Sequence, residues 1–128
     1  MQFAKRVFQV AGIYGLLVLL PQYFMEQKVG RDFPPAVTHP EFYYGFVGVA
    51  VAWQVLFLII ARDPVRYRLV MLPAVMEKAT FGFAAIALFF QHRIPTMLLP
   101  FALLDLVLGG LFLAAYRRTR PAAIATFR

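Results

Sequence analysis

Hydrophobic residues fill four long segments of this chain, and shorter polar stretches separate them. The segments cover residues 7–24, 41–61, 69–90 and 95–116. Each is close to the roughly 20 mostly apolar residues that a helix needs to cross a bilayer. The pattern therefore predicts an all-α, polytopic membrane protein with four transmembrane helices.

The polar stretches predict how these helices are connected. Only the stretch 25–40 is long enough to be called a long loop, whereas the connections near residues 62–68 and 91–94 are short. Short connections place consecutive helices side by side in opposite directions. Small residues at helical spacing, such as Ala11 and Gly15, favour close packing. We therefore expect one domain over residues 1–128, an antiparallel four-helix bundle.

Composition agrees with the membrane class and excludes several kinds of chemistry. The chain is 62% hydrophobic with a mean hydropathy of +0.71, which an ordinary soluble domain does not reach. It has no cysteine, which excludes disulfides and thiolate sites. Its two histidines, His39 and His92, are too far apart in sequence to suggest a histidine metal site, so no metal is expected.

The positions of the basic residues predict the topology. The net charge of +7 is typical of some nucleic-acid-binding proteins. Here the cations flank apolar segments instead, so we expect no nucleic-acid partner. With both termini in the cytoplasm, three cations lie on the outer side: Lys28, Arg31 and Arg93. Nine lie on the inner side: Lys5, Arg6, Arg62, Arg66, Arg68, Arg117, Arg118, Arg120 and Arg128. This asymmetry predicts an N-in, C-in protein of the cell inner (plasma) membrane. The inner cations can also contact anionic lipid head groups.

The first apolar segment has some features of a signal peptide. Lys5 and Arg6 precede it, as a charged region precedes the apolar core of such a peptide. No small-residue cleavage motif follows it, since the segment ends in Pro21-Gln22-Tyr23-Phe24. We therefore expect a retained helix.

Three charged residues lie inside the apolar segments, where a charge costs from about 2.5 to more than 10 kcal/mol. They are Glu77 and Lys78 in the third segment and Asp105 in the fourth. Counted from the inner ends at about 1.5 Å per residue, they lie roughly 12–16 Å deep. The other helices can reach this level with three further side chains: Tyr14, Trp53 and Gln54.

The adjacent residues Glu77 and Lys78 point about 100° apart on a helix. We expect an ion pair between Lys78 and Asp105, with Glu77 held by Gln54, Trp53 or Tyr14. In the alternative, Lys78 extends toward the inner surface. These six residues are the candidate ligand-binding site, and Glu77 and Asp105 are the candidates for acid–base catalysis or proton relay. They could equally serve only to bond the helices together.

Three stretches carry a resemblance to known proteins: 39–46 (HPEFYYGF), 61–64 (ARDP) and 76–78 (MEK). With them the chain resembles small uncharacterised four-helix integral membrane proteins of bacteria, a resemblance that implies no known activity. A looser likeness, in size, helix number and intramembrane acids, exists to DoxX-like proteins and to the EXPERA group. EXPERA sterol isomerases use acidic side chains in a membrane cavity, a part that only Glu77 and Asp105 could play here.

The sequence leaves three functions open. The first is an accessory subunit of a membrane complex or a homo-oligomer, which the small size and the absence of catalytic motifs favour. The second is a pocket for a lipid-like or quinone-like apolar ligand, with or without isomerase-type acid–base chemistry. The third is proton or cation transport by an oligomer. We rank an accessory or ligand-binding role ahead of catalysis, and the sequence identifies no cofactor.

Overall fold

The computed structural model describes residues 2–121 and contains, within them, five α-helices and no strand. Single 3₁₀ turns, Leu20–Phe24, Arg68–Val70 and Thr96–Leu98, extend three of the long helices. The α-helices are α1 (Gln2–Leu19), α2 (Glu26–Asp32), α3 (Pro40–Arg62), α4 (Met71–Phe90) and α5 (Leu99–Arg118).

The four long helices confirm the four predicted segments. With their 3₁₀ turns they are Gln2–Phe24, Pro40–Arg62, Arg68–Phe90 and Thr96–Arg118. Each is long and apolar enough to cross a membrane. The first helix starts five residues earlier than predicted, so Lys5 and Arg6 lie on α1 itself.

The stretch 25–40 is not only a loop, because α2 forms within it. Glu26 lies in the first turn of α2 and Arg31 in the last, where each charge suits the helix dipole. Lys28 also forms an i,i+4 ion pair with Asp32. The hydroxyl of Tyr44 donates to Glu26 Oε2 at 2.9 Å, which ties α2 to the start of α3.

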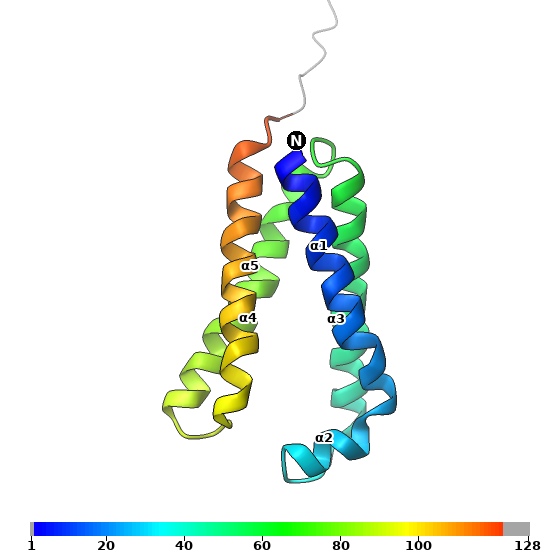
Figure 1. Cartoon of the computed structure of the whole chain (residues 1–128), viewed down its shortest axis with the longest axis vertical. Coiled ribbons are helices and arrows are strands. Elements are labelled where there is room, and N and C mark those ends of the chain that lie inside the picture. Colours follow the sequence, from blue (N-terminus) through cyan, green and yellow to red (C-terminus); the bar gives the residue numbers. More distant parts are fainter. Residues whose placement is uncertain (1, 122–128) are drawn as a thin grey trace, which may run out of the picture.

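The long helices pack as two pairs, α1 with α3 and α4 with α5 (Figure 1). Glycine allows the close approach within each pair. A Cβ on Gly12 of α1 would lie 2.9 Å from the carbonyl oxygen of Gln54 in α3. A Cβ on Gly82 of α4 would lie 2.6 Å from the side chain of Leu106 in α5. In each pair the small residue lets the two helices pack closely, as is usual between helices in lipid.

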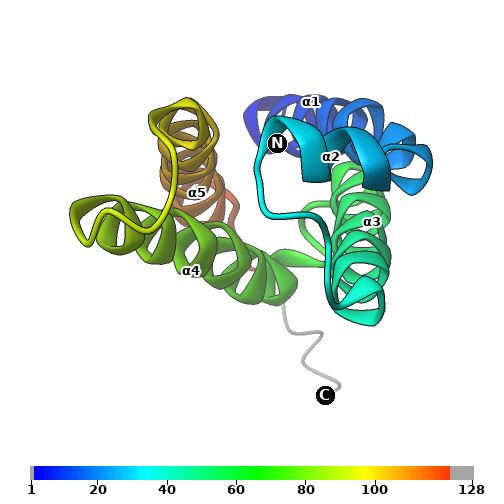
Figure 2. The same cartoon turned by 90° about the horizontal axis from the view of Figure 1, so that it is seen from below.

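The two pairs meet at one end of the molecule only. Three fully buried rings join them there: Phe8 of α1 stacks on Phe112 of α5 at 4.3 Å between centroids, and Phe57 of α3 meets Phe112 edge-on at 4.9 Å. Toward the opposite end, where α2 lies, the pairs separate (Figures 1 and 2). The described fold is thus two arms that are joined by an aromatic core.

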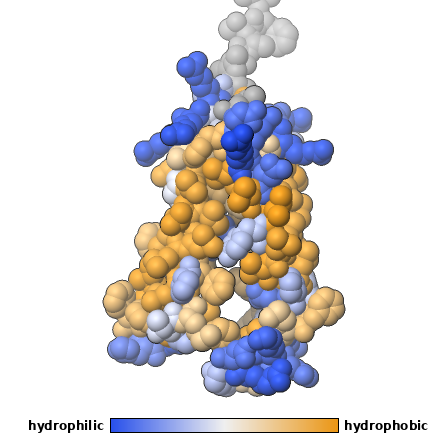
Figure 3. Space-filling view, viewed as in Figure 1, coloured by the Kyte–Doolittle hydropathy of each residue, from blue (hydrophilic) through white to orange (hydrophobic). Residues whose placement is uncertain are grey.

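The surface has the distribution that a bilayer requires. Apolar side chains cover the middle of the molecule and hydrophilic residues gather at both ends (Figure 3). Leu17, Phe83 and Val107 are 72%, 65% and 59% exposed, although they lie well inside their helices. A soluble protein rarely exposes so much contiguous apolar area. These helices therefore indicate a membrane protein that lies in a lipid bilayer.

The aromatic core predicts a large effect for one substitution. Phe112→Ala should lower the free energy of unfolding by about 2 kcal/mol, because it removes the ring that contacts both Phe8 and Phe57. This is less than the about 3–5 kcal/mol of water-soluble cores, since lipid also solvates apolar groups. Denaturation in mixed micelles measures this change in the free energy of unfolding. Phe83→Ala, at a lipid-exposed position in α4, is the control and should change stability little; equal losses in both variants would contradict the assigned core.

Candidate functional site

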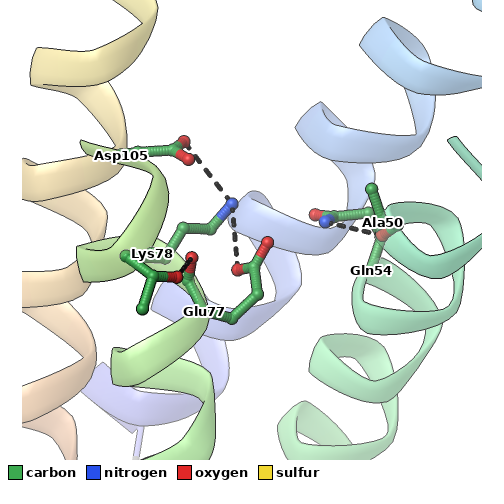
Figure 4. A network of polar contacts seen from close by, with 6 residues as sticks. Ala50, Gln54, Glu77, Lys78 and Asp105 are labelled. Carbon is green, nitrogen blue, oxygen red and sulfur yellow. Dashed lines mark hydrogen bonds and ion pairs between the residues drawn. The ribbon is translucent and has the colours of Figure 1, made fainter. Parts of the chain in front are cut away.

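The ammonium of Lys78 lies between two carboxylates. Its Nζ is 3.6 Å from Oε2 of Glu77 and 3.5 Å from Oδ1 of Asp105 (Figure 4). The side chain of Lys78 is only 8% exposed, and those of Glu77 and Asp105 are each 19% exposed. We call these three residues the charged cluster; it joins α4 to α5 in the middle of the apolar region.

The predicted ion pair between Lys78 and Asp105 is present, and its local cause is a glycine. Gly109 lies one turn after Asp105 on the same side of α5. A Cβ on Gly109 would lie only 3.3 Å from Cβ of Lys78. The lysine stem therefore runs against the backbone of α5 and brings its ammonium to the carboxylate.

The prediction for Glu77 is wrong. In the described part of the chain no hydrogen bond joins Glu77 to Gln54, Trp53 or Tyr14. Its carboxylate turns toward Lys78, the next residue. The 100° between neighbouring positions on a helix does not prevent this, because both side chains are long enough to bend toward each other.

Gln54 faces the charged cluster from the other pair of helices. It is 2% exposed, and its Nε2 donates to the carbonyl oxygen of Ala50 at 3.0 Å. Its Oε1 is buried and accepts no hydrogen bond from the described residues. This oxygen lies where a Cβ on Gly15 would be, at 1.9 Å, so the glycine makes room for the amide. The amide of Gln54 thus lies in the contact between α3 and α1, and Figure 4 draws its tip on the side of α3 that faces Glu77 and Lys78.

Tyr14 and Trp53 take different places. Tyr14 is half-buried on α1, near enough to Asp105 for the two side chains to interact electrostatically. Trp53 is half-buried and contacts the aromatic core, with its ring 6.3 Å from that of Phe57. The structure therefore brings Gln54 and Tyr14 toward the charged cluster and leaves Trp53 beside the core.

Phe57 contributes to the site and was not predicted from the sequence. Its ring centroid lies 5.3 Å from Nζ of Lys78, close enough for a cation–π interaction. Phe57 lies one turn after Gln54, so helical spacing could have suggested it. Phe57 is thus a member of the aromatic core that adjoins the charged cluster, and the ammonium lies at the boundary between the joined and the separated parts of the two pairs.

The charges of the cluster do not balance. Counted at their formal charges, two carboxylates and one ammonium leave one net negative charge in an apolar layer, where unpaired charge is costly. Oε2 of Glu77 is buried and lies 3.6 Å from Nζ of Lys78, just beyond hydrogen-bond distance, and Oε1 of Gln54 accepts no hydrogen bond within 2–121. The site therefore offers acceptor oxygens and formal negative charge to a ligand that enters the space between the two helix pairs. Over the same residues, no three histidines or carboxylates are grouped in a way that could hold a metal ion.

Fold and site together define a class, a helical membrane protein with a charged cluster between two helix pairs. Comparison with protein-family models, with curated proteins and with solved structures finds no match. The resemblances to bacterial four-helix, DoxX-like and EXPERA proteins accordingly stay predictions from the sequence.

The balance of charge within the cluster predicts a mutational cycle. Lys78→Met should destabilise the protein by about 3–5 kcal/mol, because it leaves two buried carboxylates without a cation. Adding Glu77→Gln and Asp105→Asn to that variant should restore most of the loss. Unfolding in mixed micelles measures both steps.

A lysine outside the site gives the control for this cycle. Lys28→Met removes the partner of Asp32 in an exposed pair and should cost less than about 1 kcal/mol. If Lys78→Met were as mild as Lys28→Met, or if the triple variant recovered nothing, the interactions assigned to the cluster would be wrong.

Proposed function

We propose that this protein binds a lipid-like or quinone-like amphiphile between its two helix pairs. The observation that carries the proposal is the position of the charged cluster, which lies where the pairs begin to separate. In the space-filling view an opening passes between the pairs below this level (Figure 3). An apolar tail fits between apolar helices, and the polar head of the same molecule would meet Glu77, Lys78 and Asp105.

The chemistry of the cluster favours a particular head group. Its formal net negative charge and the acceptor oxygens of Glu77 and Asp105 suit a hydroxyl or an amine. The hydroxyl groups of a quinol meet the same requirement. An ester or ether lipid that has no hydrogen-bond donor does not meet this requirement. We rank binding ahead of catalysis, and Glu77 and Asp105 stay the candidates if acid–base chemistry occurs.

A second candidate, an accessory subunit of a membrane complex or homo-oligomer, is favoured by a different observation. Gly45 of α3 and Gly110 of α5 are exposed, and a Cβ on either would have no atom within 4 Å. Exposed small residues let a helix of another chain approach closely. In this candidate a helix of another chain packs against α3 or α5 at these glycines.

The topology is part of the proposal. The start of α1, the end of α3, the start of α4 and the end of α5 lie at one end of the molecule (Figure 1). Eight of the nine cations assigned to the inner side belong to this end, and Arg128 lies outside the described residues. By the positive-inside rule we assign this end to the cytoplasm, which gives an N-in, C-in topology in the inner (plasma) membrane, and the alternating ends of successive helices favour an antiparallel bundle.

Trp53 gives a direct test of ligand binding, because it is the only tryptophan and lies next to Gln54 in sequence. A stearylamine that carries a nitroxide near its head group should quench its fluorescence saturably, and the matching alcohol should do the same. The matching methyl ester, which lacks a donor, should not. Glu77→Gln with Asp105→Asn should weaken binding of the amine by about tenfold, as expected for loss of charge-assisted hydrogen bonds.

The control for this test removes two carboxylates elsewhere. Asp32→Asn with Glu41→Gln changes exposed acids and should leave quenching unchanged. If all three amphiphiles quench alike, or both double variants behave alike, the ligand site is contradicted. A second protein that co-purifies in fixed ratio, with the amphiphile excluded, would support the accessory subunit instead.

The topology can be tested cleanly because the chain has no cysteine. Gln2, Gln27 and Gln91 are all exposed, and each can be changed to Cys. In intact cells a membrane-impermeant maleimide should label Gln27→Cys and Gln91→Cys at once, and Gln2→Cys only after permeabilisation. The reverse pattern would contradict the N-in topology.

A further inference from the structure

A groove between α1 and α3 opens at the basic end of the molecule. It has a volume of about 540 Å³ and combines two kinds of lining. Lys5 and Arg6 of α1 and Arg62 of α3 supply three cations, and we call these three residues the cationic rim. Val55 and Ile59 of α3 supply an apolar wall toward the middle of the bilayer. We call this the inner-end groove.

The groove is built for negative charge. Its lining belongs wholly to the described residues and contains no carboxylate, while Gln2 and Gln9 add side-chain amides beside the cations. The nearest acid in sequence, Asp63, accepts a hydrogen bond from the backbone N–H of Arg66 at 3.1 Å and is engaged outside the groove. Arginine guanidinium groups bind phosphate through paired hydrogen bonds, and lysine adds a point charge.

The apolar wall decides which anion the groove fits. Val55 and Ile59 are 45% and 40% exposed, and both lie within one to two turns of Arg62 on α3. They therefore continue the apolar surface from the rim into the hydrocarbon region. A free phosphate ion would use the rim alone, whereas a phospholipid would use the rim for its head group and the wall for an acyl chain.

We propose that the inner-end groove is a binding site for an anionic phospholipid. The cationic rim holds the phosphate, and the chain of the lipid lies along Val55 and Ile59. This site is separate from the charged cluster, which belongs to α4 and α5 and is net negative. It also differs from a diffuse surface attraction, because other cations at the same end, Arg66 and Arg117 among them, do not line the groove.

Native mass spectrometry of the purified protein tests the proposal. After exchange into detergent with added phosphatidylglycerol or phosphatidylcholine, the wild type should retain phosphatidylglycerol preferentially. The variant Lys5→Gln, Arg6→Gln, Arg62→Gln should bind it about tenfold more weakly, since each cation near the membrane contributes to attraction of anionic lipid. The matched control, Arg66→Gln, Arg117→Gln, Arg120→Gln, removes the same charge at the same end from exposed positions and should bind like the wild type.

Two further arms separate the lipid from a free phosphate and from misfolding. Ile59→Asn should weaken phosphatidylglycerol binding but not competition by inorganic phosphate, because only the lipid needs the wall. If the triple variant does not stay monodisperse, the single exposed change Arg6→Gln replaces it, with Arg117→Gln as its control. Three results would overturn the proposal. The groove and control variants could lose equal affinity for phosphatidylglycerol, or the wild type could retain both lipids equally. The third is full displacement of the lipid by inorganic phosphate with no effect of Ile59→Asn. Amine quenching of Trp53 should be unchanged in the groove variants, so the two sites can fail independently.

Discussion

A lysine held between two acids in an apolar layer is the interaction on which the rest of this structure depends. Glu77 and Asp105 lie 3.6 and 3.5 Å from Nζ of Lys78 and oppose its formal charge. The pairing fixes the register of α4 against α5, and Gly109 makes the approach possible. It also leaves one negative charge over, which is why the cluster is more than an internal neutral pair.

The aromatic core and the charged cluster divide the molecule into two parts with different roles. Phe8, Phe57 and Phe112 close the space between the pairs at the basic end. Beyond Phe57 the pairs separate, and Lys78, Gln54 and Tyr14 lie near that transition. Since apolar helices gain little from burial against each other in lipid, an open arrangement costs less here than in water. Lipid, a ligand or a partner helix can fill it.

The sequence predicted those features that depend on composition and local spacing. The four apolar segments became the four long helices, because the length needed to span a bilayer and the polar breaks between segments are both local signals. The pairing of Lys78 with Asp105 could also be predicted, since few cations exist at that depth. The helix α2 was missed because its seven residues are mostly polar and its stabilising contact, Tyr44 with Glu26, links distant positions.

The parts that could not be predicted depend on how the pairs lie in space. Hydropathy does not say that α1 packs on α3 and α4 on α5, nor that the pairs separate beyond Phe57. For this reason the predicted partner of Glu77 was wrong. Gln54 belongs to the other helix pair, and its amide donates a hydrogen bond within its own helix. Photolabelling tests the central claim most directly. An alkylamine with a diazirine beside its amine, used on the protein in bilayers and mapped by peptide mass spectrometry, should label positions around Gln54, Glu77 and Asp105, and unlabelled amine should compete. Labelling confined to outward positions such as Leu17 and Phe83, without competition, would contradict it.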